Sequence, residues 1–393
     1  MSRLDELIQE LCPNGVEYKP IKNVYRRLKG TPITAGKMKE IESADGDIRI
    51  FAGGKTIIDA FESDIPNANI TRVPAVLVQS RGVIDAVYYE KPFTFKNEMW
   101  AYTHKNKIAV KFLYYVLKNN MSKFREAASG MGSLPQISLK VTEDFEIPVP
   151  PLEVQSEIVR ILDNFTKLTA ELTAELTARK KQYEYYRNKL LSFNELIKSG
   201  GCQLKKLREI AEYSHKRINA IAMKKDNYVG VDNLLPNKAG KVGSNYVPTK
   251  GNLTAYVIGD VLIGNIRPYL KKIWLAYNEG GASGDVLVIH LIDQSVDVKY
   301  LYQVLADDKF FNYNMQFAKG AKMPRGSKQK IMDYIIPVPS LEEQRRIVSI
   351  LDKFDMLTTS ISEGLPKEIE LRRKQYEYYR NQLLSFPDNK ATA

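Results

Sequence analysis

Two stretches of the chain carry apolar residues at alternating spacings of three and four positions. They are Ile158, Ile161, Phe165, Leu168 and Leu172 in the first stretch, and Ile347, Ile350, Phe354, Leu357 and Ile361 in the second. This spacing places the apolar side chains on one face of an α-helix and is typical of a helix that packs along another helix. Proline followed by leucine and glutamate near the beginning of each stretch indicates a helix start.

The first predicted helix continues to about Phe193, which gives it about 40 residues and a length of about 60 Å. The second is interrupted at residues 363–368, where Gly364 and Pro366 disturb regular helical hydrogen bonding. Neither has the Gly and Ser content of a flexible linker, so we expect them to pack antiparallel as a rigid spacer. Within the first helix, residues 169–176 contain TAEL twice, and one such unit adds about 6 Å.

Both stretches belong to an internal repeat. Residues 147–169 and 336–358 agree at 15 of 23 positions, and RKKQYEYYRNKLLSF at 179–193 agrees with RRKQYEYYRNQLLSF at 372–386 at 13 of 15 positions. Shorter matches link residues 110–117 with 298–305, and 18–24 with 204–210. Four matched blocks in the same order indicate domain, helix, related domain, helix. The repeated tyrosine segment indicates two equivalent roles, although a duplication without functional symmetry remains an alternative.

These patterns predict an α+β protein with two globular α/β domains separated by two long antiparallel, coiled-coil-like helices and related by a pseudo-two-fold internal repeat. A chain of 393 residues that is 44% hydrophobic is long enough for more than one core. The expected segments are 1–150, a first domain with a short N-terminal helix; 151–198, the first spacer helix; 199–339, the second domain; 340–386, the second spacer helix; and 387–393, a tail.

The net charge of +12 is concentrated in the two predicted domains. Residues 16–150 hold 20 Lys and Arg against 15 Asp and Glu, and residues 202–339 hold 20 against 12. The remaining segments, which contain the repeated tyrosines, are close to neutral. Two separate basic domains favour binding to a polyanion.

Motifs for chemistry are missing from the sequence. Cys12 and Cys202 form no disulfide framework, and the three histidines are isolated, so we expect free thiols and no metal site. FAGGKT at 51–56 is not a phosphate-binding loop, because Arg49 occupies the position of the first glycine. No dinucleotide-binding, amino-methyltransferase, nuclease or Ser/His/Asp pattern stands out. These features favour a binding subunit over an enzyme.

No apolar run approaches the roughly 20 residues that a bilayer crossing needs. The first residues indicate a short amphipathic helix rather than a signal peptide. We therefore expect a cytoplasmic protein with no membrane partner.

The segments PVPPLEVQSEIVRILD and PVPSLEEQRRIVSILD, the TAEL tandem and the RKKQYEYYRN repeat resemble DNA-specificity subunits of type I restriction–modification enzymes, most closely the type IC group. The resemblance covers the whole chain in layout and is strongest in the helices. It implies that each basic domain is a target-recognition domain for one half of a split, asymmetric site in double-stranded DNA. The helices would set the unread gap, and two TAEL units suggest roughly 6 base pairs.

The resemblance also implies partners. Two methyltransferase subunits, which use S-adenosylmethionine to methylate adenine, would dock on the helices. A restriction and translocation subunit that uses ATP and Mg would join them, and none of these cofactors would bind this chain.

Base reading requires donors and acceptors on a rigid edge in the major groove. AVLVQSRG at 75–82 and DVLIGNIRPYLKK at 260–272 are predicted strands that end in such residues. We expect base contacts from Gln79, Ser80, Arg81, Asn265 and Arg267. Phosphate or base contacts are predicted for Lys55, Lys271, Lys272, Lys322 and Arg325. For each of these lysines and arginines the alternative is an ordinary solvated charge.

The repeated segment places tyrosine and arginine, which are favoured at protein interfaces, on a helix surface. The predicted partner interface comprises Tyr183, Tyr185, Tyr186, Arg187, Tyr376, Tyr378, Tyr379 and Arg380. Packing between the two long helices is the alternative for Tyr183 and Tyr186. Two other functional classes stay open, a stand-alone nuclease or methyltransferase and a scaffold that binds no DNA; salt-dependent DNA affinity would exclude the scaffold.

Overall fold

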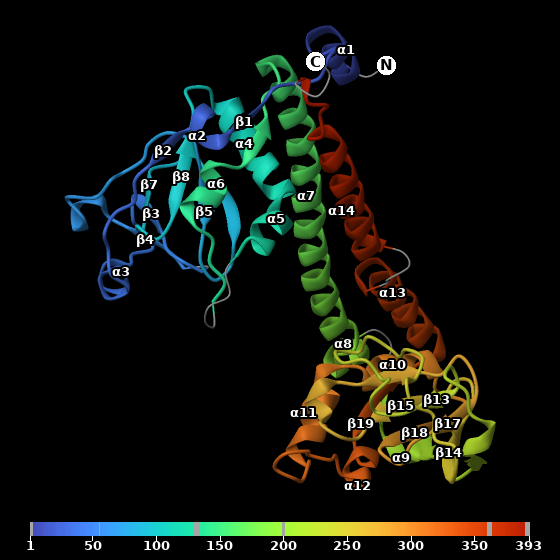
Figure 1. Cartoon of the computed structure of the whole chain (residues 1–393). Coiled ribbons are helices and arrows are strands. Elements are labelled where there is room, and N and C mark those ends of the chain that lie inside the picture. The colour runs from blue at the N-terminus through green and yellow to red at the C-terminus, as the bar shows by residue number, and fades with distance from the viewer. Residues whose placement is uncertain (1–2, 55, 129–133, 199–200, 360–363, 390–393) are drawn as a thin grey trace. The chain divides into compact units, whose positions relative to one another are not determined.

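The computed structural model describes residues 3–54, 56–128, 134–198, 201–359 and 364–389. The chain divides into two compact units (Figure 1). Unit 1 contains Met1–Glu171 and Glu370–Ala393, and unit 2 contains Leu172–Ile369. Each unit therefore combines one globular region with parts of the long helices. The α+β class and the two globular regions joined by long helices are as predicted.

Unit 1 begins with the predicted amphipathic helix and continues into a small mixed domain. Its helices are α1 (Arg3–Leu11), α2 (Ile21–Val24), α3 (Ala35–Ile41), η1 (Glu62–Asp64), α4 (Lys107–Asn119), α5 (Met121–Glu126) and α6 (Leu139–Glu143). Its strands are β1 (Tyr18–Pro20), β2 (Arg26–Leu28), β3 (Ile48–Phe51), β4 (Ile57–Ala60), β5 (Ala75–Gln79), β6 (Asp85–Tyr89), β7 (Phe93–Phe95), β8 (Trp100–Thr103) and β9 (Glu146–Pro148).

The strands of unit 1 form one sheet of order β2-β8-β5-β6, a second of order β4-β3-β7, and the antiparallel pair β1-β9. Every residue of β5 is buried, which explains its continuous apolar run. The helix α4 packs against β5 and β6. Figure 1 shows α4 between these strands and the first half of the long helix, with α3, β3 and β4 at the far end of the domain.

Unit 2 repeats this plan with different elements. Its helices are α8 (Phe193–Lys198), α9 (Leu207–Ile210), η2 (Ala220–Ala222), η3 (Pro268–Leu270), α10 (Val298–Leu305), α11 (Asp308–Gln316) and α12 (Lys328–Met332). Its strands are β10 (Cys202–Lys206), β11 (Ala211–Tyr213), β12 (Arg217–Asn219), β13 (Tyr228–Val229), β14 (Asn252–Tyr256), β15 (Val261–Gly264), β16 (Ile273–Leu275), β17 (Gly280–Ala282), β18 (Val286–Leu291) and β19 (Ile335–Pro339).

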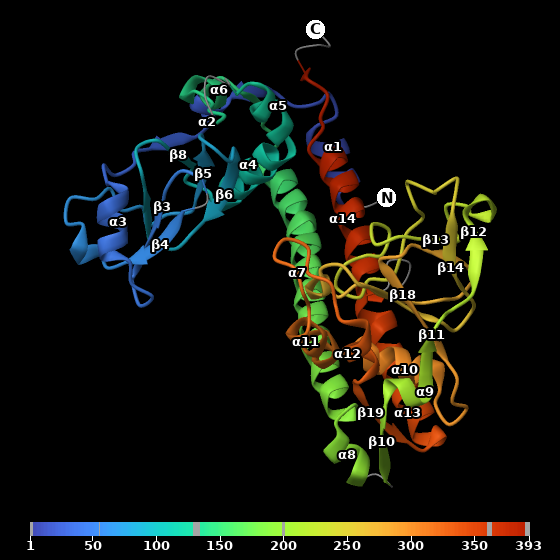
Figure 2. The ribbon, with the colours of Figure 1, turned by 90° about the horizontal axis from the view of Figure 1, so that it is seen from below.

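The main sheet of unit 2 has the order β11-β18-β15-β16, the same pattern as in unit 1. The pairing of the central strands is also similar. In unit 1, Leu77 of β5 pairs with Ala101 of β8, and in unit 2, Leu262 of β15 pairs with Val288 of β18. A second sheet of order β12-β14-β17-β13 and the pair β10-β19 complete the unit. Figure 2 shows β10 and β19 beside α8, and β12 and β14 well away from them.

The long helices are α7 (Leu152–Leu190), α13 (Leu341–Thr359) and α14 (Gly364–Leu383). Both predicted starts are confirmed, since α7 and α13 begin at the Leu-Glu that follows proline or serine. The predicted interruption is also confirmed, because α13 ends at Thr359 and α14 begins at Gly364, with Pro366 in its first turn. Proline is tolerated there because the first N–H groups of a helix have no intrahelical acceptor.

Within unit 1, the first half of α7 and the last turns of α14 run side by side in opposite directions (Figure 1). Phe165 stacks on Tyr379 with ring centroids 5.6 Å apart. Leu384 and Phe386 join the core that contains Val154 and Ile158. The predicted apolar seam of the first helix therefore packs, in its N-terminal half, on the repeated tyrosine segment of the last helix.

The chain beyond α14 returns to the beginning of the domain. The Val16 N–H donates to the Pro387 carbonyl at 2.9 Å, and the Tyr18 hydroxyl donates to the Phe386 carbonyl at 2.9 Å. Gly15 has a φ of +86°, and a Cβ there would lie 2.3 Å from the Pro387 carbonyl oxygen. Only glycine fits this close crossing. The described part of the predicted tail is thus bonded to the domain.

Candidate DNA interface

In unit 2, two loops cross at the end of strand β15. The Gly326 N–H donates to the Asn265 carbonyl at 3.2 Å, and the Arg267 N–H donates to the Pro324 carbonyl at 2.7 Å. The second loop is a narrow hairpin, because Lys319 and Arg325 exchange backbone hydrogen bonds at 2.9 and 3.0 Å. We call residues 265–267 and 319–326 the unit 2 tip. Backbone bonds on both sides fix its position relative to the sheet.

Unit 1 has the same crossing at the end of strand β5. The Ile137 N–H donates to the Ser80 carbonyl at 2.9 Å, and the Gly82 N–H donates to the Pro135 carbonyl at 2.9 Å. Arg81 forms a bridge with Gln136, as Ile266 does with Arg325. We call residues 80–82 and 134–137 the unit 1 tip. The hydrogen bonds make Ser80 equivalent to Asn265, and Gly82 equivalent to Arg267.

This equivalence aligns the two strand ends, which read Gln-Ser-Arg in unit 1 and Gly-Asn-Ile-Arg in unit 2. Arg81 corresponds to Ile266, and Arg267 has no arginine counterpart. The short pattern Pro-x-x-Ser, at 135–138 and 324–327, marks the second loop in both units and was the overlooked signal.

Three of the predicted base readers are buried. Gln79 is 5% exposed, Ser80 is 1% exposed and Asn265 is 6% exposed. The Ser80 hydroxyl donates to the Glu98 carbonyl at 2.6 Å. In this conformation the three side chains support the tips from beneath rather than project from them. Their burial indicates a supporting role, because a buried side chain offers little surface for contact with a base.

The glycine in the unit 2 tip allows this close packing. A Cβ at Gly326 would lie 2.2 Å from Asn314 Oδ1 and 2.9 Å from Asn265 Oδ1. Asn314, which no sequence motif marks, is 1% exposed and comes from α11. Any larger residue at position 326 would push the hairpin away from the sheet.

Three predicted cations already have partners inside unit 2. Lys271 Nζ lies 2.8 Å from Asp308 Oδ2, and Arg325 Nε lies 3.2 Å from Asp285 Oδ1. Lys272 Nζ donates to the Val231 carbonyl at 2.6 Å. These side chains are half-buried or tethered, so their first role is to hold loops together. These contacts cannot be predicted from the sequence motif, because the acceptor groups lie far away along the chain.

Three of the remaining predicted cations differ from the preceding three in their exposure and in having no charge partner in the part of the chain that the structure describes. Arg81, Arg267 and Lys322 are exposed, and among the described residues their charged groups make no hydrogen bond or ion pair. Lys322 lies in the hairpin between Lys319 and Arg325. Lys55 lies outside the described residues. Among the described residues of the predicted DNA-contact set, one exposed cation without a hydrogen-bond or ion-pair partner lies in the unit 1 tip and two lie in the unit 2 tip.

The predicted partner interface contains a pair of exposed tyrosines in each unit. Tyr185 is 61% exposed and Tyr378 is 59% exposed. Each meets the next tyrosine edge to face, with ring centroids 5.4 Å apart and an interplanar angle of 75° in both units. Their neighbours Tyr186 and Tyr379 are 37% and 38% exposed. The two copies therefore present the same aromatic surface.

Tyr183 and Tyr376 pack inward, as the alternative interpretation expected for Tyr183. Tyr186, the other residue of that alternative, stacks on Phe354 with ring centroids 5.7 Å apart and stays 37% exposed. Tyr183 stacks on Phe354 at 5.8 Å, and Tyr376 lies 6.4 Å from Phe165. Burial raises the pKa of both phenols, so they stay neutral at physiological pH. These two residues contribute to the helix core of each unit.

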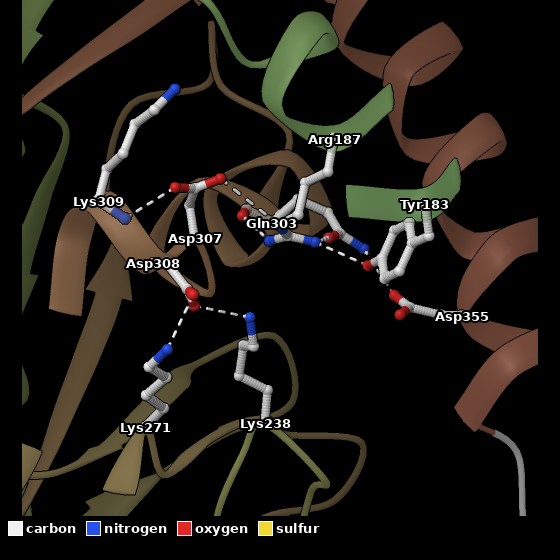
Figure 3. Close-up of polar contacts among 9 residues, drawn as sticks. All are labelled: Tyr183, Arg187, Lys238, Lys271, Gln303, Asp307, Asp308, Lys309 and Asp355. Atoms are coloured by element: carbon white, nitrogen blue, oxygen red, sulfur yellow. Dashed lines mark hydrogen bonds and ion pairs between the residues drawn. The ribbon is translucent and has the colours of Figure 1, made fainter. Parts of the chain in front are cut away.

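The two repeated arginines have different environments. Arg187 is only 7% exposed, and its guanidinium donates to Gln303 Oε1 at 2.6 Å, to the Tyr183 hydroxyl at 2.7 Å and to the Gln303 carbonyl (Figure 3). Its Nε lies 3.6 Å from Asp307 Oδ2. The hydrogen-bonding groups of Arg187 are therefore used inside unit 2. A buried side chain of this kind does not fit the prediction that Arg187 contacts a partner subunit. Arg380 is half-buried and donates to Asn119 Oδ1 at 2.9 Å.

Three observations concern metal binding, membrane crossing and the cysteines. Within the described residues, no group of three or more His, Cys, Asp or Glu side chains is placed to hold a metal ion. None of the helices in that part of the chain combines the length and apolar character that a membrane crossing requires. Cys12 and Cys202 are free thiols, and burial raises the pKa of each.

Comparison with known proteins agrees with this architecture. The family model described as type I restriction modification DNA specificity domain matches residues 16–179 and 193–371. The chain therefore belongs to the family of type I restriction–modification specificity subunits, and it is the DNA-specificity subunit, not a catalytic subunit, of such a system.

Individual relatives lead to the same assignment. The chain is 36% identical over 318 residues to the EcoR124I/EcoR124II specificity subunit of Escherichia coli, covering 72% of each chain. It is 33% identical over 272 residues to the EcoprrI specificity subunit of Escherichia coli, covering 65% of this chain and 63% of that one. EcoR124I is a type IC enzyme, which agrees with the predicted group.

A solved structure shares the fold. The S subunit of a type I restriction–modification system from M. genitalium superimposes with a TM-score of 0.59 at 17% identity, covering 95% of this chain and 97% of that chain.

Proposed function

We propose that the chain directs its complex to a bipartite, asymmetric site in double-stranded DNA, with one half read by each unit. The observation that carries this proposal is the pair of tips. They are built by the same strand order and the same crossing hydrogen bonds, yet carry different residues. Ser-Arg-Gly crosses Gln136 in unit 1, and Asn-Ile-Arg crosses Arg325 in unit 2. Two tips with the same backbone arrangement but different side chains are suited to reading two different half-sites.

The exposed residues of the two tips are suited to two kinds of contact, with DNA bases and with DNA phosphates. Arg81 and Arg267 extend from tips that backbone bonds hold rigidly, which suits base contacts. Lys322 lies in a hairpin and suits a phosphate contact, which sets position but carries no sequence information. The revised DNA-contact set is Arg81, Arg267 and Lys322, with Lys271, Lys272 and Arg325 as loop anchors.

The proposed gap between half-sites depends on α7. This helix is continuous through both TAEL units, with Leu172 and Leu176 half-buried and the Ala and Glu residues exposed. A gap of roughly 6 base pairs follows from the family resemblance and the number of units. One unit changes the helix by about 6 Å, which corresponds to one or two base pairs.

We further propose that two methyltransferase subunits dock on the duplicated tyrosine surfaces, one at Tyr185–Tyr186 and one at Tyr378–Tyr379. Equal exposure and equal ring geometry in both units favour two copies of the same partner. Those partners would supply S-adenosylmethionine chemistry, and a restriction subunit would supply the ATP- and Mg-dependent chemistry. The assembly would work in the cytoplasm, where the host DNA is.

Docking is tested by subunit composition. Native mass spectrometry of the assembled complex should show two methyltransferase copies for the wild type and a loss of one copy for Tyr185→Ala or Tyr378→Ala. The double variant should lose both. Tyr183→Phe serves as the matched control, because its ring packs inward, and it should keep both copies. Full assembly of the double variant would reject this surface.

DNA reading is tested by mapping methylated adenines in cells that carry the system. The proposal expects one two-part motif with different halves and a fixed gap. Binding of the purified complex should also weaken steeply with salt. A palindromic motif, or affinity that does not respond to salt, would contradict two different reading domains.

A further inference from the structure

Four non-glycine residues have positive φ in the described chain, and all lie in unit 2. They are Asn237 (56°), Lys238 (63°), Arg267 (51°) and Lys271 (51°). Left-handed backbone is unfavourable for L-residues with a Cβ, and such outliers cluster where the surrounding structure enforces them. Arg267 and Lys271 bracket the short turn η3, and the N–H groups of Asn237 and Lys238 donate to the carbonyls of Leu270 and Lys271 at 2.8 and 2.9 Å.

One carboxylate anchors both of these loops. Asp308, in the first turn of α11, accepts from Lys238 Nζ at 3.0 Å and from Lys271 Nζ at 2.8 Å (Figure 3). Partial burial acts to raise the pKa of Asp308, but the hydrogen bonds from the two lysines outweigh it, so the pKa lies below its usual value and the group stays charged. The helix α11 also packs against η3.

Arg267 is the exception among these outliers. The two lysines use their charges within the fold, whereas the Arg267 guanidinium is exposed and makes no hydrogen bond or ion pair among the described residues. Its counterpart Gly82 reaches a φ of +77° without strain. The crossing geometry therefore does not require an arginine, and glycine would satisfy it better.

We propose that Arg267 reads one guanine in the half-site of unit 2, and that Asp308 positions it by holding the η3 turn. This inference rests on the proposed function and names the residue and base that carry part of it. The Arg267 backbone is fixed by its bond to Pro324 and by Pro268, which follows it. A rigidly based guanidinium fork matches the O6 and N7 acceptors of guanine in the major groove.

A phosphate contact is the competing role for Arg267. It would need only a charge and would affect all bases alike, whereas base reading needs the fork and affects one position. Lys322, in the second loop of the unit 2 tip, provides the internal comparison, because it is exposed and carries only a point charge.

The experiment uses the full chain assembled with its methyltransferase partner and a DNA library randomised across the half-sites. Arg267→Ala and Arg267→Lys should each lose about 10- to 100-fold discrimination at a single G·C pair and keep the rest of the motif. Arg267→Gly should show the same loss while the chain melts at or above the wild-type temperature, because glycine relieves the left-handed strain. Lys322→Ala should weaken binding to all sequences equally.

Asp308→Asn tests the positioning role. It should blunt discrimination at the same pair, while affinity for unrelated DNA stays equal or rises because two lysines are released. An unchanged motif in Arg267→Gly, or equal weakening at all bases, would overturn the guanine assignment. An unchanged motif in Asp308→Asn would overturn the positioning role. Failure of the proposed function looks different, since the wild-type complex would then select no two-part motif.

Discussion

The repeated arginines provide a matched pair for testing the packing of the two units. Arg187 and Arg380 occupy the same position in a nearly identical segment, yet one is buried in a charged network and the other bonds to a single amide. Replacing Arg187 with Ala leaves Asp307, which is 4% exposed, without its ion-pair partner, and leaves Gln303 without its donor. Removing one partner of a buried pair costs about 3–5 kcal/mol.

The same change at Arg380 should cost much less. Its hydrogen bond is to the neutral Asn119, and its contact with the ring of Tyr376 lies 5.3 Å from the ring centroid. The donor is a charged guanidinium on a half-buried side chain, so loss of this hydrogen bond costs about 1.5–2 kcal/mol. The two variants should therefore differ by about 2 kcal/mol, which corresponds to roughly 30-fold in the local opening equilibrium.

Hydrogen exchange measured by mass spectrometry resolves this difference locally. In Arg187→Ala, peptides from α10 and α11 should lose protection strongly, while in Arg380→Ala peptides from α4 should lose little. Adding Asp307→Asn to Arg187→Ala should restore part of the loss, because the amide can still cap α11 through the Lys309 N–H and carries no unpaired charge. Equal effects at the two arginines would refute this reasoning.

Three further predictions address the spacer, the helix break and a surface ion pair. Deleting residues 173–176 should change the unread gap by one or two base pairs in a methylated-adenine map without changing the bases read, and an unchanged gap would reject the spacer role. Gly364→Ala should lower the unfolding free energy in urea by about 1–3 kcal/mol, because φ is +77° and a Cβ would lie 2.4 Å from the Met356 carbonyl oxygen; Gly36→Ala, with an ordinary φ and open surroundings, should not. Hydrogen bonds from Lys205 and Ser295 lower the pKa of Asp293 to about 2, so Asp293→Asn should be less stable than wild type near neutral pH, and the difference should vanish as pH falls from about 4 through about 2.

The helices could be predicted from the sequence because their signals are periodic and local. Apolar spacing located α7 and α13, proline located their starts, and Gly364 with Pro366 located the break. The duplicated blocks also indicated two related domains. Each of these inferences needs only residues that are neighbours along the chain.

The candidate interface was only partly predictable. The sequence located the ends of β5 and β15, but the burial of Gln79, Ser80 and Asn265 depends on the rest of the fold around those strand ends, including the loops that cross there. Besides the neighbouring Tyr183, the partners of Arg187 come from α10 and the beginning of α11, more than a hundred residues away. The left-handed backbone at Arg267 results from a crossing loop, and no local pattern predicts left-handed backbone at an arginine.

The central claim is that the two units read two different half-sites independently. The most direct test replaces residues 202–339 with the corresponding domain of another type I specificity subunit and maps methylated adenines in the resulting cells. We predict that one half of the motif changes to that of the donor, while the other half and the gap stay the same. A motif that changes in both halves, or does not change at all, would contradict the account.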